Sequence, residues 1–121
     1  MRDDSVYLNH IADCLLRIER NIANGLDEFL TSEIIQDATL RNLQTMSEAT
    51  QRLSAEIKSS RPDIEWDLIA DFRNVLVHNY LGIDLELVWL IIERDMPPLR
   101  QAVNEMIANR HNAGTNKLHF F

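Results

Sequence analysis

Glycine and proline are scarce in this chain. Its 121 residues include 3 Gly and 3 Pro, while 45% of the residues are hydrophobic. A β-sandwich or barrel needs many tight turns, which these two residue types commonly form, so the composition argues against such folds. Helix-compatible Leu, Ile, Ala, Glu, Arg and Gln are abundant. We therefore predict an all-α fold, an antiparallel bundle of four to five helices. It should form one domain over residues 1–110, followed by a flexible C-terminal tail at 111–121.

The chain also lacks a long hydrophobic run and has a single cysteine. No segment approaches the roughly 20 consecutive apolar residues that a membrane-spanning helix needs. The N-terminus, Met1-Arg2-Asp3-Asp4, lacks the basic and then apolar order of a secretion signal. We expect a soluble, cytoplasmic protein without a membrane partner.

Cys14 cannot form an internal disulfide, and its place beside the apolar face of the first helix predicts a buried structural thiol. His10 lies one helical turn before it, which is the spacing of half a metal site. Structural packing is the favoured interpretation because the chain has no second cysteine. We therefore expect neither a metal nor another cofactor.

Positive charge is in short supply. Twelve basic residues against nineteen acidic ones give a formal charge of −7, which works against sequence-independent binding of nucleic acid. Any contact with nucleic acid must therefore be local. The candidates for a basic rim are Arg41, Arg52, Lys58 and Arg61. Glu48 and Glu56 interrupt this rim.

Apolar residues recur at helical spacing in four segments. The first helix should begin with Asp3 or Asp4 as its cap and stop at Gly25, followed by a short link over 26–30. A second, long helix should start after a Thr31-Ser32 cap and run to about Lys58. The first helix is expected to be buried along Leu8, Ile11, Leu15, Ile18 and Ile22.

Two further helices follow a turn-like breaker at residues 59–63 that contains Pro62. The third should run from Trp66 to about Tyr80 with Leu68, Ile69, Phe72, Val75 and Leu76 on its buried face. The last should be capped by Asp84 and kinked or restarted at Pro97-Pro98. Its opening run, 85–92, is apolar nearly all round, which predicts neighbours on several sides, from its own chain or from a second copy.

Chemically active side chains concentrate in the segment 71–80. Arg73, Asn74, His78 and Tyr80 bring a cation, an amide, an imidazole and a phenol together. Arg73 and His78 differ by roughly 140° in direction on an ideal helix, so they cannot easily bind one small group. Either the helix ends near His78 and turns the ring, or a two-fold axis brings in a second copy. Val77, an apolar residue predicted to point outward between them, favours a homodimer.

This set of side chains suits the cleavage of RNA. Arginine binds phosphate through two charged hydrogen bonds, and histidine transfers protons near neutral pH. A 2′-hydroxyl attack on the adjacent phosphate needs a base, an acid and a cation. From residue types alone, however, Arg and His near a helix end are more often capping and salt-bridging groups. Asn74 could orient His78 or face water, and Tyr80 could be a packing residue with an exposed hydroxyl.

The segment resembles the HEPN superfamily, specifically the HepT-like toxins that are paired with minimal nucleotidyltransferases. Their signature is Arg, four residues, His, one residue, Tyr, and here it is Arg73, His78 and Tyr80. The likeness covers roughly residues 4–110. It includes the stretches Gln36-Asp37-Ala38 to Arg41-Asn42-Leu43, Glu48-Ala49, 62–66 and 82–89. A bare arginine–histidine spacing is a weak signal, but this ordered set is much more specific.

The resemblance implies a homodimeric helical bundle that cleaves RNA or tRNA without a metal ion, as the toxin of a type VII-like toxin–antitoxin module. By position it implies Arg73 and His78 as catalytic residues and Asn74 as the supporting polar residue. It implies that the partner nucleotidyltransferase transfers AMP to Tyr80, which silences the toxin, and that a larger heteromeric complex can form with this antitoxin. Asn79 departs from the glycine that often stands between His and Tyr, which leaves the modification geometry open.

Two classes of function remain after the sequence. The complete motif favours the ribonuclease, whereas the acidic charge suits a non-catalytic helical adaptor that binds and regulates a nucleotidyltransferase.

Overall fold

The computed structural model describes the backbone of residues 3–118 and the side chains of residues 3–79 and 81–110. Within this part of the chain every regular element is helical, which confirms the all-α prediction. The elements are α1 (Asp4–Asn21), α2 (Leu26–Thr31), α3 (Glu33–Gln51), α4 (Ala55–Ser59), α5 (Trp66–His78), the 3-10 turn η1 (Tyr80–Gly82) and α6 (Leu85–Leu118). The described residues thus form six α-helices, more than the four to five expected.

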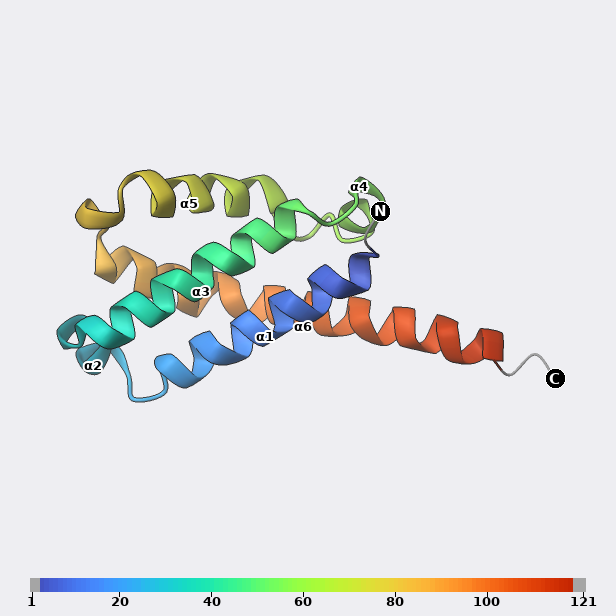
Figure 1. Ribbon diagram of the computed structural model, residues 1–121, viewed down its shortest axis with the longest axis horizontal. Coiled ribbons are helices and arrows are strands. Elements are labelled where there is room, and N and C mark those ends of the chain that lie inside the picture. The colour runs from blue at the N-terminus through green and yellow to red at the C-terminus, as the bar shows by residue number, and fades with distance from the viewer. Residues whose placement is uncertain (1–2, 119–121) are drawn as a thin grey trace.

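Four long helices make up the bundle. Helix α3 packs between α1 and α5, and α1 also packs against α6. Figure 1 shows that successive long helices run in opposite directions, so α1, α3, α5 and α6 form an antiparallel arrangement. Helix α5 lies at one edge of it, because its main packing partner is α3.

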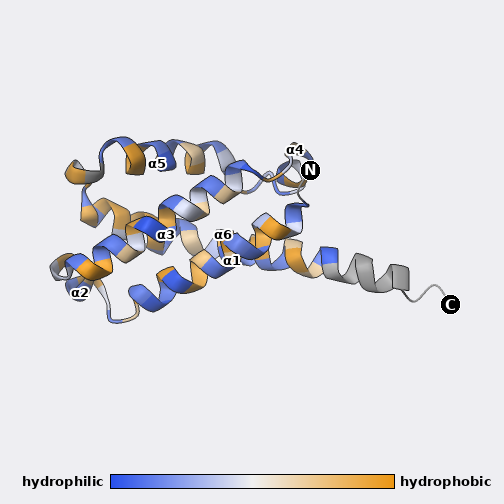
Figure 2. Ribbon diagram, viewed as in Figure 1, coloured by the Kyte–Doolittle hydropathy of each residue, from blue (hydrophilic) through white to orange (hydrophobic). Residues whose placement is uncertain are grey.

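The core follows the predicted apolar spacing of α1. Leu8, Ile11, Leu15 and Ile18 are all buried, as is Cys14. Figure 2 shows hydrophobic residues alternating with hydrophilic ones along the long helices, which is typical of a bundle with one buried face per helix. The other helices complete the core with Phe29, Leu40, Leu43, Met46, Ala49, Leu53, Leu76, Val88, Ile92, Met96, Leu99, Ala102, Val103 and Met106.

Local capping signals were read correctly. The Asp3 side chain accepts a hydrogen bond from the Ser5 amide at 3.2 Å, and the Ser32 side chain accepts one from the Ile35 amide at 3.3 Å. Asp84 accepts from the amides of Glu86 and Leu87 at 3.1 and 3.2 Å. These bonds satisfy backbone donors that a helix start leaves without partners.

Two expectations about helix boundaries were wrong. The link over 26–30 is the short helix α2, and Gly25, with φ at +96°, begins it rather than stopping α1. The long second helix does not reach Lys58, because the chain breaks after Gln51 and restarts as α4. At the break, the Asp4 carboxylate accepts hydrogen bonds from the Ser54 amide and hydroxyl at 2.8 and 2.7 Å.

Helix α6 runs through Pro97 and Pro98, so of the two predicted outcomes the restart does not occur, and the kink stays a prediction. Each proline removes a backbone donor, at a cost of about 3 kcal/mol in a helix interior. Met96 and Leu99 flank the prolines and are both buried, so packing of α6 on the core holds the two halves in one helix. Its backbone is helical to Leu118, but side chains from His111 on lie outside the described residues, so the 111–121 tail stays a prediction.

Among the described residues no helix is long and apolar enough to cross a membrane. The location of the protein in the cell stays a prediction.

Candidate functional site

Helix α5 carries the arginine and the histidine and is fixed at both ends. At its start, the Trp66 indole donates to the carbonyls of Lys58 and Arg61 at 3.1 and 3.2 Å, which ties the helix to the preceding turn. At its end, the Asn79 amide donates to the Val75 carbonyl at 2.9 Å. His78 is therefore the last residue of α5, as one of the two sequence-based alternatives required.

The buried face of α5 is narrower than predicted. Leu76 is buried, and Ile69 and Phe72 are partly buried against the core. Leu68 and Val75, which were expected on this face, are exposed. The reason is the edge position of α5: it has one main neighbour, α3, so only the stripe that faces α3 is covered. The phase of the pattern was right, but one neighbour cannot bury a wide stripe.

Arg73 lies between α5 and α3, with its side chain 31% exposed. One terminal nitrogen is 3.5 Å from Glu48 Oε1, and the other donates to Asn74 Oδ1 at 3.2 Å. Its Nε is buried and has no hydrogen-bond partner among the described residues. Gln44 donates to Glu48 Oε1 at 3.0 Å and so holds the carboxylate that faces the arginine. The guanidinium is thus oriented from two sides, while part of it still reaches solvent.

Asn74 and His78 lie on the outer, exposed face of α5. The amide of Asn74 pairs with Arg73, and no hydrogen bond between Asn74 and His78 is found in the described part of the chain. Nor does any hydrogen bond join Arg73 to His78 there. Within one chain the structure pairs Arg73 with Asn74 and leaves His78 exposed at the end of α5. The side chain of Tyr80 lies outside the described residues; only its backbone, in η1, is described.

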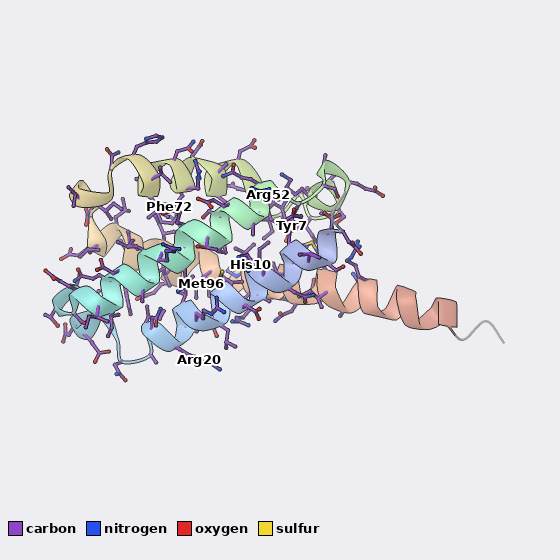
Figure 3. The ribbon with its side chains drawn as sticks, viewed as in Figure 1. Tyr7, His10, Arg20, Arg52, Phe72 and Met96 are labelled. Atoms are coloured by element: carbon purple, nitrogen blue, oxygen red, sulfur yellow. The ribbon has the colours of Figure 1, made fainter. Side chains whose placement is uncertain are left out.

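Sequence reasoning assigned no role in the site to Glu48 or Gln44. Their four-residue spacing on the polar side of α3 predicts that they contact each other. Which residue of α5 faces them depends on how two helices pack, and local spacing does not contain that information. Figure 3 shows polar side chains along the outer sides of α3 and α5.

Cys14 differs in its burial from the polar and charged residues His10, Asp67 and Asp71. Cys14 is fully buried, and this burial raises the pKa of its thiol, so the predicted structural role is consistent with its surroundings. His10 is exposed on α1, as are Asp67 and Asp71 on α5. No group of three or more His, Cys, Asp or Glu side chains suited to a metal ion is present in the described part.

Two cavities lie in other parts of the bundle. One, of about 750 Å³, lies between α1 and α6. The other, of about 590 Å³, is a groove bordered by α3, α5 and α6, with Leu68, Phe72 and Ile91 in its lining. Arg73 and His78 line neither of the two. Arg73 is partly exposed and His78 is exposed, so both side chains reach solvent outside these two cavities.

The fold and the motif together define a small all-helical protein with an arginine and a histidine five residues apart on an edge helix. Residues 11–106 match the family model described as "Ribonuclease HepT-like". The match spans most of the chain and includes the whole motif, so this chain belongs to the HepT-like family.

Related proteins agree with this assignment. The chain is 31% identical over 82% of its length to a Thermococcus cleftensis protein named "Probable ribonuclease HepT", covering 91% of that protein. It is 29% identical over 88% of its length to a "Putative RNase" of Caldanaerobacter subterraneus subsp. tengcongensis, covering 96% of it.

A longer relative, from Methanocaldococcus jannaschii, is named "Gamma-glutamylcyclotransferase and putative RNase". It is 31% identical over 99% of this chain, which spans 54% of that protein's length. No solved structure matches the chain.

Proposed function

We propose that this protein is an endoribonuclease whose catalytic residues are Arg73 and His78. The observation that carries the proposal is the arrangement at the end of α5: a guanidinium oriented by Glu48 and Asn74, and an exposed imidazole at the last residue of the helix. Membership in the HepT-like family and the names of the relatives, which denote ribonucleases, support the same activity.

The chemistry divides between the two side chains. Arg73 would hold the scissile phosphate and stabilise the negative charge that builds on it during attack by the adjacent 2′-hydroxyl. His78 would remove the proton from that hydroxyl or protonate the leaving 5′-oxygen. These steps need no metal ion in principle, and the polar neighbour Asn74 supports the reaction by keeping Arg73 in place.

The proposal requires a homodimer, because Arg73 and His78 of one chain are separated by roughly 140° around an ideal helix. Exposed apolar residues support a self-association surface. Six of the ten large hydrophobic residues that are exposed in the described part lie between residues 68 and 90. We call this set the α5–α6 surface: Leu68, Val75, Val77, Leu81, Leu87 and Leu90. Figure 2 shows hydrophobic colour where α5 ends and α6 begins. A two-fold axis near this surface would bring the Arg73 and His78 residues of two copies to one cleft.

The test of catalysis is cleavage of tRNA and total RNA in EDTA by wild type, Arg73→Ala and His78→Ala. We expect both variants to lose activity. Arg20→Ala and His10→Ala are matched controls, because both residues are exposed on α1 and their loss should leave activity unchanged. Activity that survives both substitutions on α5 would exclude this site.

We further propose that the chain is the toxin of a toxin–antitoxin pair and that a partner minimal nucleotidyltransferase silences it by transferring AMP to Tyr80. An AMP group would add negative charge and bulk two residues from His78, where it would compete with substrate phosphate for Arg73. Mass spectrometry after incubation with the partner and ATP should show added AMP on wild type and none on Tyr80→Phe. Addition to that variant would place the modification elsewhere.

A second candidate function is that of a non-catalytic adaptor that binds and regulates the nucleotidyltransferase. Two observations favour it: the formal charge of −7, and the ion pair with Glu48 that occupies part of Arg73. The two candidates are distinguished by the cleavage assay, since an adaptor binds the partner equally well with and without Arg73 and His78 and cleaves nothing.

A further inference from the structure

Most arginines in the described part of the chain are already paired with carboxylates. The pairs are Arg61 with Asp63 and Glu105, Arg73 with Glu48, Arg94 with Asp95, Arg100 with Glu19, and Arg110 with Asp3. Of the basic rim considered from the sequence, Arg61 is thus engaged elsewhere. The arginines without an ion pair to another described residue are Arg17 and Arg20 on α1, Arg41 on α3 and Arg52 at the C-cap of α3, all exposed.

Arg41 and Arg52 lie on the same face of α3 as Glu48. Steps of seven and four residues keep all three side chains within about 40° of one another around the helix. Along the axis, Arg41 is about 10 Å and Arg52 about 6 Å from Glu48, on opposite sides. Because Glu48 contacts Arg73, the Arg73 guanidinium lies between the two exposed arginines. Asp37 lies one turn beyond Arg41 and marks the acidic end of this strip.

The antiparallel packing of α3 and α5 gives the strip a direction. His78, toward the end of α5, lies on the Arg41 side of Arg73, whereas Asp67 and Asp71 lie on the Arg52 side. These two aspartates are exposed and repel a phosphate on the Arg52 side, and Asp37 does the same beyond Arg41, so the strip is bounded by negative charge at both ends. Figure 3 shows Arg52 at the end of α3. It shows Arg20 on α1, at the edge of the molecule that faces away from α5.

We propose that Arg41 and Arg52 bind phosphates of a single RNA strand on either side of the phosphate that Arg73 holds. The strip over α3 is then the substrate track of each subunit. The inference rests on the proposed ribonuclease function and deepens it by naming the residues that recognise the substrate backbone. The charge of Glu48, the one carboxylate inside the strip, is countered by Arg73 and by the Gln44 amide. A local row of guanidiniums thus provides positive charge for RNA binding in a protein whose net charge is negative.

The experiment measures binding of a fluorescein-labelled, unstructured oligoribonucleotide to full-length dimer carrying His78→Ala, which prevents cleavage. The test variant adds Arg41→Gln and Arg52→Gln; the matched control adds Arg17→Gln and Arg20→Gln and removes the same charge. Single strands contribute about 0.7 to the salt slope per phosphate contact, so the slope should fall by about 1.4 in the test variant. Affinity at about 0.1 M salt should fall on the order of 10-fold. The control should match the parent.

The single variants refine the expectation, since Arg41→Gln and Arg52→Gln should each lower the salt slope by about 0.7. In the active protein, Arg41→Gln plus Arg52→Gln should raise KM and leave kcat nearly unchanged, because neither residue touches the reacting phosphate. Equal losses in the test and control variants would overturn the track while leaving the ribonuclease intact. A wild type that neither binds nor cleaves RNA would refute the proposed function itself. Thermal melts check that the variants, all at exposed positions, are folded.

Discussion

Replacing Leu90 with glutamate tests the dimer on which the ribonuclease proposal depends. Leu90 is 61% exposed in the single chain, and Leu81 and Leu87 of the same α5–α6 surface are 100% and 53% exposed. Burying a whole leucine side chain contributes about 1.5–3 kcal/mol. Covering the exposed part of Leu90 is thus worth about 1–2 kcal/mol per copy, and about 2–4 kcal/mol in a two-fold dimer, where each residue counts twice.

That free energy corresponds to a weakening of the dimer Kd by about 30- to 700-fold. The buried charge of the new glutamate adds to the effect, since desolvating a carboxylate without a partner is unfavourable. Sedimentation velocity over a dilution series measures the Kd. RNA cleavage by Leu90→Glu, assayed at the same concentrations, should fall in step with the dimer fraction.

The matched control is Leu16→Glu, because Leu16 is an exposed leucine on α1, away from α5. Its dimer Kd and activity should equal those of wild type. The reasoning is refuted if Leu90→Glu dimerises like wild type, or if the wild type cleaves RNA at concentrations where it sediments as a monomer.

Three other predictions concern stability and pH. Thr39 Oγ1 is buried without a hydrogen-bond partner among the described residues, so Thr39→Val should stabilise the protein by about 1 kcal/mol in urea unfolding. Thr50→Val loses a 2.7 Å hydrogen bond to the Ser47 carbonyl and should destabilise the protein by about 1 kcal/mol in the same assay. Phe29 is fully buried beside Trp89, and Phe29→Ala should cost about 3–5 kcal/mol in the same assay. A hydrogen bond from Arg61 lowers the pKa of Asp63 below 3.8. A carboxyl group whose pKa is lower in the folded state than in the unfolded state stabilises the fold at pH values above its unfolded-state pKa. This stabilisation is lost as the pH falls through the folded-state pKa. Asp63→Asn should therefore have a lower Tm than wild type at neutral pH and the same Tm in strong acid. An equal difference in Tm at both pH values would contradict a stabilising role of the ionised Asp63 carboxylate.

The sequence was a good guide wherever structure is decided locally. The stripe of Leu8, Ile11 and Leu15 and the caps at Ser32 and Asp84 depend on residues at most a few positions apart, and these predictions were confirmed. The break before α4 carries a local signal that was missed, because the Ser54 side chain caps α4 by accepting a hydrogen bond from the Ile57 amide. Its contact with Asp4 could not be predicted this way, because Asp4 lies 50 residues from Ser54 in sequence.

The candidate site likewise has features that follow from local sequence and features that depend on helix packing. The motif on α5 and the exposed positions of Asn74 and His78 follow from the sequence and helical geometry. The contact between Arg73 and Glu48 does not, because it is set by the packing of α5 on α3. The exposure of Leu68 was missed for a related reason: periodicity gives the direction of a buried face, but the number of neighbouring helices decides its width.

The pairing of Arg73 with Glu48 bears on how an acidic protein could act on RNA. At 3.5 Å, and with both side chains partly exposed, this ion pair contributes at most about 1 kcal/mol. Two parallel charged hydrogen bonds to a phosphate are stronger, so a substrate could displace Glu48 at little cost. The Glu48 carboxylate would orient Arg73 in the free protein and release it when a substrate phosphate binds. The same negative charge, spread over the rest of the surface, would discourage RNA from binding anywhere else. The net charge of −7 is therefore compatible with a ribonuclease that binds its substrate along the α3 strip, where two arginines without ion pairs flank Arg73.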